Sequence, residues 1–220
     1  LAAQKARITP ATMMALLRDH GPGGANPRWH PSRGLRGTTL CMHASWGPLR
    51  PSQTAGSLVA HLAPGLQTHW LTGTSTPCTG LFKPVYLNGA GLPDLGPAPG
   101  GTCDRKSLWW AHERLQRAVI QDYRARLSLY RGERDELEGA FLAEAAEAQA
   151  RYRDAPVDER SAALAAFTAS CFARAAAATA RWREAVMAAP VRRRQPALFS
   201  LAWRRHNRRA GLDDLVVGAR

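Results

Sequence analysis

The stretch from Thr38 to Pro84 limits the possible folds more than any other part of this chain. Short apolar runs alternate there with Gly, Pro, Ser and Thr, which is typical of consecutive strands joined by tight turns. Four strands are predicted, over residues 39–44, 54–62, 67–72 and 80–87. Because parallel crossovers need longer connections than these, the spacing predicts an antiparallel meander.

A helix is predicted before these strands, between Thr9 and His20. Thr9 is suited to cap its first turn, and Pro10 suits the first helical position, where a missing N–H has no consequence. The apolar face that follows consists of Met13, Met14, Leu16 and Leu17. Residues 21–37, rich in Gly, Pro, Asn, Arg and Ser, then predict a loop.

Helical periodicity dominates the second half of the chain. Apolar residues recur at the 3.6-residue period over 104–130, where Glu113 and Arg117 form an i,i+4 pair of favourable polarity. Further helices are predicted over residues 133–153 and 158–189. These patterns predict one α+β domain with a long C-terminal helical region.

Three parts follow from these predictions. Residues 1–103 form the strand-rich part with one N-terminal helix, and residues 104–190 form the helical part of the same domain. A Gly- and Pro-rich segment over 88–101 predicts a long surface connection between them. The Arg-rich residues 191–220 predict a basic, solvated and partly mobile tail.

The composition is that of a globular chain, with 45% hydrophobic and 21% charged residues. A net charge of +13 favours anionic partners, but Arg with abundant Ala, Gly and Pro is also typical of a GC-rich genome. A nucleic-acid partner is therefore not expected. No apolar run was long enough to predict a membrane span, and the first residues lack the apolar block of a secretory signal.

The cysteines and histidines predict no cofactor and no metal site. The four cysteines lack a CxxC pair, so reduced thiols and a cytoplasmic location are expected. The seven histidines are scattered, and no paired Cys/His spacing occurs. No Walker loop, dinucleotide-binding glycine motif or GxSxG elbow is present either.

Two short segments contain the candidate site residues. Cys41 and His43 alternate on one face of the first predicted strand, which allows a nucleophile–base pair, although packing is the favoured interpretation of Cys41. The polar run after Arg50 places small hydroxyl groups and an amide at a strand end, where they can orient a substrate. The predicted pocket residues are His43, Ser52, Gln53 and Thr54.

Five motifs occur in an order that resembles the later part of the secernins and related cysteine dipeptidases. They are Cys-Met-His-Ala at 41–44, the Ser-Gln-Thr-Ala-Gly-Ser-Leu-Val run at 52–59, His-Trp-Leu-Thr-Gly-Thr at 69–74, the Pro-Cys-Thr-Gly-Leu-Phe-Lys-Pro-Val run at 77–85, and Leu-Trp-Trp-Ala-His-Glu-Arg-Leu at 108–115. With the first helix, the resemblance covers roughly Ile8 to Leu142.

The resemblance implies a partial αββα sandwich of the N-terminal nucleophile hydrolase kind, with antiparallel strands at about 38–87. In that class a processed first-residue cysteine attacks a small peptide substrate, and its own α-amino group is the base. Since no cysteine precedes Cys41, the nucleophile is expected upstream of Leu1, and this chain alone is expected to be inactive. A partial sandwich also predicts self-association through uncovered sheet surface.

The sequence is also compatible with two other classes of function. The helices over 133–189 are compatible with a non-catalytic interaction protein that presents a surface to a partner. The Arg-rich tail is compatible with a basic nucleic-acid-binding protein, whose affinity would fall steeply with salt.

Overall fold

The computed structural model describes residues 8–24, 26, 29–32, 39–45, 50–87, 92–193 and 195–215. The fold is mixed α+β, as predicted, with 52% helix and one small antiparallel sheet. The elements in chain order are α1 (Pro10–Leu17), β1 (Leu58–His61), β2 (Thr68–Leu71), β3 (Lys83–Val85), α2 (Leu108–Val119), the 3-10 turn η3 (Ile120–Asp122), α3 (Tyr123–Leu127), α4 (Arg131–Tyr152), α5 (Val157–Ala188), α6 (Ala197–Arg209) and the 3-10 turn η4 (Asp213–Leu215).

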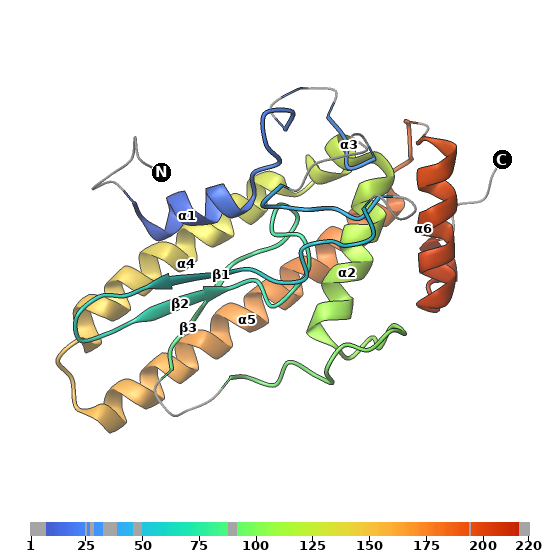
Figure 1. Ribbon diagram of the computed structural model, residues 1–220. Coiled ribbons are helices and arrows are strands. Elements are labelled where there is room, and N and C mark those ends of the chain that lie inside the picture. Colours follow the sequence, from blue (N-terminus) through green and yellow to red (C-terminus); the bar gives the residue numbers. More distant parts are fainter. Residues whose placement is uncertain are drawn as a thin grey trace.

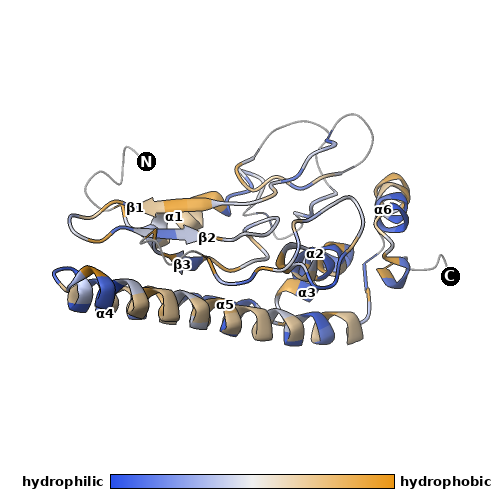
Figure 2. Cartoon of the chain, turned by 90° about the horizontal axis from the view of Figure 1, so that it is seen from below, coloured by the Kyte–Doolittle hydropathy of each residue, from blue (hydrophilic) through white to orange (hydrophobic). Residues whose placement is uncertain are grey.

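The sheet is a meander in the order β1-β2-β3, and both strand pairs are antiparallel. Trp70 in the central strand pairs with Val59 on one side and Pro84 on the other. Helix α1 packs on β1, whereas α4 and α5 pack on β3. Seen from below, the α4–α5 pair therefore runs along one side of the strands, with β3 nearest to it (Figures 1 and 2).

The predicted strand over residues 39–44 is wrong. The backbones of Met42 and Thr54 do pair, through a hydrogen bond of 2.9 Å from the Thr54 amide to the Met42 carbonyl. The Met42 amide, however, donates to the Thr54 hydroxyl at 3.0 Å, and that hydroxyl donates to the Leu40 carbonyl at 3.2 Å. Because a side chain occupies these backbone groups, the segment is extended without forming a ladder.

The first helix is capped as its sequence predicts. The Thr9 hydroxyl accepts the Thr12 amide at 3.2 Å, the Thr12 hydroxyl approaches the Thr9 amide at 2.8 Å, and Pro10 occupies the first turn. These contacts satisfy backbone N–H groups that an uncapped helix end leaves unpaired.

The helical second half also agrees with its predicted periodicity. Helices α4 and α5 form a long hairpin joined by a turn at residues 153–156. The predicted surface connection is irregular and mostly exposed over residues 92–101, and its first part, 88–91, lies outside the described residues.

Helix α5 is long and apolar enough to cross a membrane, which the sequence analysis did not predict. This criterion considers length and composition only, and the core helices of soluble proteins meet it as well. In this fold α5 packs against α2 and β3, and 33% of its most apolar 18-residue stretch is buried.

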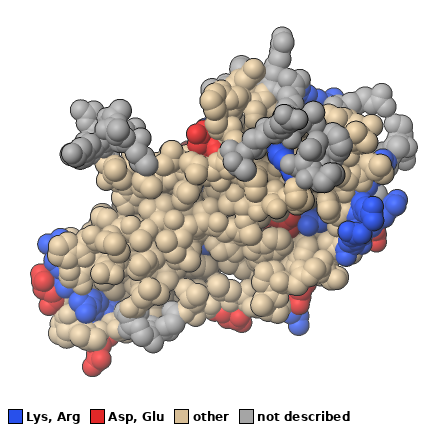
Figure 3. Space-filling model, viewed as in Figure 1, with Lys and Arg blue, Asp and Glu red and all other residues tan. Residues whose placement is uncertain are grey.

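The Arg-rich end is a packed helix over part of its length, so the prediction of a solvated, mobile tail is wrong for residues 197–209. Helix α6 buries Phe199, Trp203 and Asn207 against the rest of the domain. Its other face gathers arginines into the blue patch beside the C-terminal end (Figure 3), and four of them, Arg204, Arg205, Arg208 and Arg209, line a surface hollow of about 410 Å³. Arg194 and residues 216–220 lie outside the described part of the chain.

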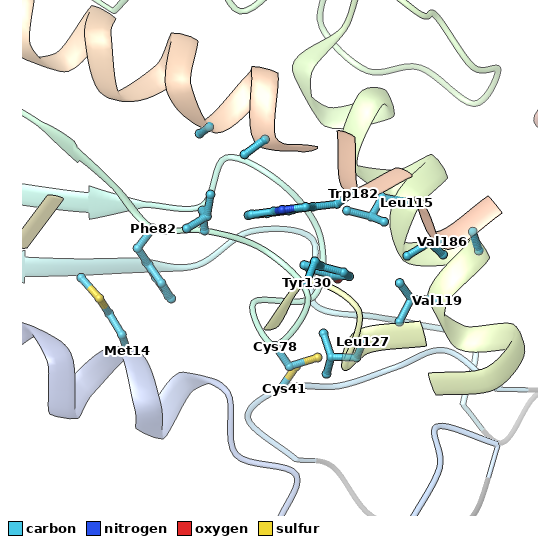
Figure 4. Close-up of a cluster of buried hydrophobic side chains, with 14 of the residues drawn as sticks. Met14, Cys41, Cys78, Phe82, Leu115, Val119, Leu127, Tyr130, Trp182 and Val186 are labelled. Carbon is cyan, nitrogen blue, oxygen red and sulfur yellow. The ribbon is translucent and has the colours of Figure 1, made fainter. Parts of the chain in front are cut away.

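The main hydrophobic core lies between the sheet, α2 and the α4–α5 hairpin. Tyr130 and Trp182 stack there with ring centroids 4.8 Å apart, close to Phe82 and Leu115 (Figure 4). The edge of this core carries the polar side chains from which the candidate site is built.

Candidate functional site

The extended segment after Leu40 brings Cys41 and His43 to the same buried side. Cys41 is 0% exposed and His43 is 3% exposed, whereas the residue before Cys41, Leu40, is 52% exposed. The prediction that the two residues share a face is confirmed, because the Cys41 Sγ lies 3.7 Å from the His43 Nε2.

A tight turn over residues 76–80 carries Cys78 to the same imidazole. Its Sγ lies 3.2 Å from the His43 Nε2. Thr76 adopts a φ of 42°, which a β-branched residue rarely adopts without support from its surroundings. The turn is therefore held in place by its contacts with other elements.

Side chains from α4 and from the end of α1 supply those contacts by donating to backbone carbonyls of the turn. The donors are Arg18 to Pro77 and Gly80, Tyr130 to Thr79, and Arg134 to Cys78. The position of the Cys78 thiol thus depends on packing between the N-terminal helix and α4.

His20, just beyond the end of α1, completes the group. Its Nε2 lies 3.1 Å from the His43 Nε2, and its ring stacks on Trp29 at 4.1 Å between centroids. The ligand atoms of His20, Cys41, His43 and Cys78 all lie within 4.8 Å of one another, and we call these residues the Cys/His cluster. Figure 4 shows its two cysteines side by side.

The pKa values of the two thiols in the Cys/His cluster are shifted in opposite directions. Burial raises the pKa of Cys41, and the neighbouring Cys78 raises it further. Burial acts in the same direction on Cys78, but hydrogen bonding with Cys41 and the charge of His43 bring its pKa below the usual thiol value. Of the two thiols, Cys78 therefore loses its proton more readily.

Glu113 of α2 is the centre of a second buried group. The carboxylate is 0% exposed and accepts hydrogen bonds from Gln53 at 3.0 and 3.1 Å, from Ser75, and from Arg117 at 2.8 Å. The predicted Glu113–Arg117 pair is confirmed as a salt bridge. The Oε1 atom of Gln53 is buried and has no hydrogen-bond partner among the described residues.

The four predicted pocket residues do not line one cavity in the part of the chain that the structure describes. His43 belongs to the Cys/His cluster, and Gln53 faces Glu113. The Thr54 hydroxyl forms hydrogen bonds with the backbone of Leu40 and Met42, and Ser52 is exposed.

A small cavity that the sequence analysis missed lies between β3, α2 and α5. Its volume is about 70 Å³, and we call it the Lys83 cavity. Its lining combines polar side chains with Leu and Ala, and the polar ones are Thr74, Lys83, His112, Thr179 and Arg183. The signal for it was a lone Lys within the apolar run Leu-Phe-Lys-Pro-Val of residues 81–85.

Lys83 is held by the backbone around it. Its ammonium group donates to the carbonyls of Thr72 at 2.6 Å and Leu81 at 3.0 Å, and it lies 5.3 Å from the centre of the Phe172 ring. Burial lowers its pKa to about 7, although the charge of Glu138 acts in the opposite direction. Lys83 is therefore a cation that can lose its proton near neutral pH.

His112 lies beside Lys83 in the same cavity. Its Nε2 is 3.2 Å from the Thr79 hydroxyl, and the side chain is buried. Burial and the charge of Lys83 lower the pKa of His112 to about 4. The ring is therefore neutral in the folded protein at pH 7.

We expect acid to destabilise the fold through His112. Its unfolded pKa of 6.5 exceeds the folded value of about 4, so the unfolded chain binds the extra proton in this interval and the unfolding free energy falls as pH decreases. The loss approaches about 3 kcal/mol. Urea unfolding across this pH range measures it, and His112→Gln should remove that part of the slope. An unchanged slope in the variant would contradict the assignment.

Comparisons of the chain with protein-family models, with curated proteins and with solved structures give no match. The chemistry of the site is therefore inferred from its own residues.

Proposed function

We propose that this chain forms the substrate-binding part of a secernin-like amide hydrolase that cleaves small peptides, and that none of its four cysteines is the attacking thiol. The observation that supports this proposal is the convergence of the segments in which the sequence resembles that family. All five are linked to one another by hydrogen bonds or close polar contacts.

Hydrogen bonds connect these segments directly. Residues 52–59 bond to the cysteine segment through Thr54 and Met42, and the Thr72 amide of the 69–74 segment donates to the Ser57 carbonyl at 3.0 Å. Helix α2 joins them through Glu113, which Gln53 contacts, and through the Trp109 indole, which donates to a backbone carbonyl of the same segment at 3.1 Å. Direct contact among these segments is what a shared site requires, whereas five unrelated packing motifs need not meet.

The αββα architecture is proposed on the same ground. The sheet packs on the α4–α5 hairpin through β3, as one sheet and one helical layer of a sandwich would. The opposite edge strand β1 exposes Leu58, which is 55% accessible. A second sheet stacked on this face, or a second copy of the chain, would cover the exposed side chain.

The Lys83 cavity has the chemistry that a peptide carboxylate needs. Lys83 and Arg183 provide positive charge, and Thr74 and Thr179 provide hydroxyl groups at an otherwise aliphatic wall. At about 70 Å³ the cavity is too small for a whole peptide and suits only its terminal group. We assign it to the free carboxylate of a dipeptide.

The environments of the cysteines argue against a nucleophile among them. Cys41, Cys78 and Cys171 are buried, so a peptide carbonyl has no path to their sulfur atoms. Cys103 is more accessible, but burial raises its pKa, and a raised pKa leaves less thiolate to attack.

The experiment is a calorimetric titration of the purified chain with Ala-Ala and with its carboxamide, together with a turnover assay. We expect Ala-Ala to bind at least about tenfold more tightly than the amide, since a charged hydrogen-bonding pair contributes about 1.5–3 kcal/mol. Lys83→Met should remove this preference, and Lys106→Met, at an exposed position, should retain it. Circular dichroism checks that both variants fold.

Two results would overturn the proposal. Equal affinity for the acid and the amide would remove the carboxylate site. Turnover of Ala-Ala by this chain that disappears in Cys41→Ala or Cys78→Ala would show that a cysteine of the chain is the nucleophile.

A further inference from the structure

The Cys/His cluster is more crowded than hydrogen bonding among its members explains. The His43 Nε2 has three neighbours, His20 Nε2 at 3.1 Å, Cys78 Sγ at 3.2 Å and Cys41 Sγ at 3.7 Å. One imidazole nitrogen carries either one hydrogen or one lone pair, so it makes one strong hydrogen bond at a time. Three polar groups around this nitrogen are better explained by a shared centre.

The distances agree with the edges of a metal tetrahedron. Zinc bonds of about 2.0–2.1 Å to nitrogen and about 2.3 Å to sulfur place two nitrogens about 3.3 Å apart and a nitrogen and a sulfur about 3.5 Å apart. The two nitrogens are separated by 3.1 Å, and the His43 nitrogen lies 3.2 and 3.7 Å from the two sulfurs. All four ligand atoms lie within 4.8 Å of one another, so side-chain movements of about 1 Å would bring them to bonding distance of a common ion.

The charge of such a centre suits its surroundings. Two thiolates neutralise a divalent cation, so the occupied site carries no net charge into the interior. Aromatic rings enclose it, because Trp29 stacks on His20 and Tyr123 presents its edge to His43 at 5.8 Å between centroids. His20 itself is only partly buried, which leaves a route for the ion to enter.

We propose that His20, Cys41, His43 and Cys78 bind a structural zinc ion in a closed Cys₂His₂ site. This site is independent of the proposed hydrolase function. Four protein ligands leave no open position for substrate, so the ion stabilises the fold and takes no part in peptide cleavage. It joins the end of α1, the extended segment and the turn at 76–80, and none of its four ligands lies inside a helix or strand.

The sequence predicts no metal site because it contains no short paired Cys/His spacing. The ligands instead come from three segments, and only Cys41 and His43 are close in sequence. A Cys-x-His pair by itself does not indicate zinc. The turn around Thr76 and the contacts of Arg18 bring the other two ligands to it.

The experiment titrates the metal-free, fully reduced chain with Co²⁺, whose absorption bands report coordination geometry and thiolate bonding. We expect one Co²⁺ per chain, the intense visible bands of a tetrahedral site, a thiolate-to-cobalt charge-transfer band, and loss of these bands when Zn²⁺ is added. Metal analysis of the chain purified without chelator should find about one zinc per molecule. Zinc should also raise the thermal midpoint of the reduced chain.

Matched variants distinguish this site from adventitious binding. Cys78→Ser and Cys41→Ser should each lose the charge-transfer bands and at least about tenfold in affinity, and His43→Gln should lose the tetrahedral spectrum. Cys103→Ser and Cys171→Ser, whose thiols lie outside the cluster, should bind Co²⁺ like the wild type. Circular dichroism of the metal-free variants checks that they remain folded.

Three outcomes would overturn the proposal. The first is a reduced wild-type chain that gives no tetrahedral Co²⁺ spectrum. The second is a Cys78→Ser chain that gives the wild-type spectrum. The third is a Cys41–Cys78 disulfide that forms under the reducing conditions of the titration, detected by mass spectrometry, because it would remove both thiolate ligands.

Discussion

Replacing Glu113 by Ala is expected to lower the unfolding free energy by about 3–5 kcal/mol, because the change leaves a buried cation without its partner. The carboxylate is 0% exposed and holds Gln53, Ser75 and Arg117. Removing it leaves the Arg117 guanidinium, whose side chain is 10% exposed, without its anion. Urea denaturation monitored by tryptophan fluorescence measures the change.

Graded variants separate charge from shape at this position. Glu113→Gln keeps an acceptor for Gln53 but removes the charge, so its loss should be smaller than that of Glu113→Ala. Combining Glu113→Gln with Arg117→Met removes both charges, and the double variant should recover part of the stability. A Glu113→Ala protein as stable as the wild type would show that this network contributes nothing to the fold.

Replacing Glu138 by Ala is the second change with a large expected effect. Glu138 accepts two hydrogen bonds of 2.6 Å from Arg18 and one of 2.9 Å from the Phe82 amide. It thereby ties α1 and the start of β3 to α4. We expect a loss of about 3–5 kcal/mol in unfolding free energy, since a buried guanidinium and a backbone N–H lose their partner together.

The chain offers a matched control for that substitution. Glu144 of α4 also pairs with an arginine, Arg174 of α5, but the two side chains are 36% and 38% exposed. Glu144→Ala should therefore cost no more than about 1 kcal/mol in chemical denaturation. Equal losses of unfolding free energy in the Glu138 and Glu144 variants would show that the Arg18–Glu138 ion pair contributes no more than an exposed pair.

The helices before residue 190 and the three strands could be predicted because their signals are local. Apolar residues recur at helical spacing through α2, α4 and α5, and Thr9 caps α1 with atoms only three residues away. Local signals could not show that residues 39–44 do not form a strand. Their alternation correctly indicated that Cys41 and His43 share a face. The Thr54 hydroxyl, far away in the sequence, bonds to the backbone groups that a strand ladder would use.

The candidate sites were harder to predict because their members meet only through long-range packing. Lys83 was visible as a charge within an apolar run, yet its cavity exists only because α5 contributes Thr179 and Arg183 opposite it. The Arg-rich end was expected to be solvated from charge alone, although Phe199 and Trp203 on one face of α6 were the signal that it packs.

Local sequence determined which segments become helices and which extend, since backbone propensity, capping and periodicity act within a few residues. The tertiary structure alone decided which side chains share a site. His20, Cys41 and Cys78 are far apart along the chain, and only the packing of α1 against α4 and the turn around Thr76 bring their ligand atoms within 4.8 Å of one another.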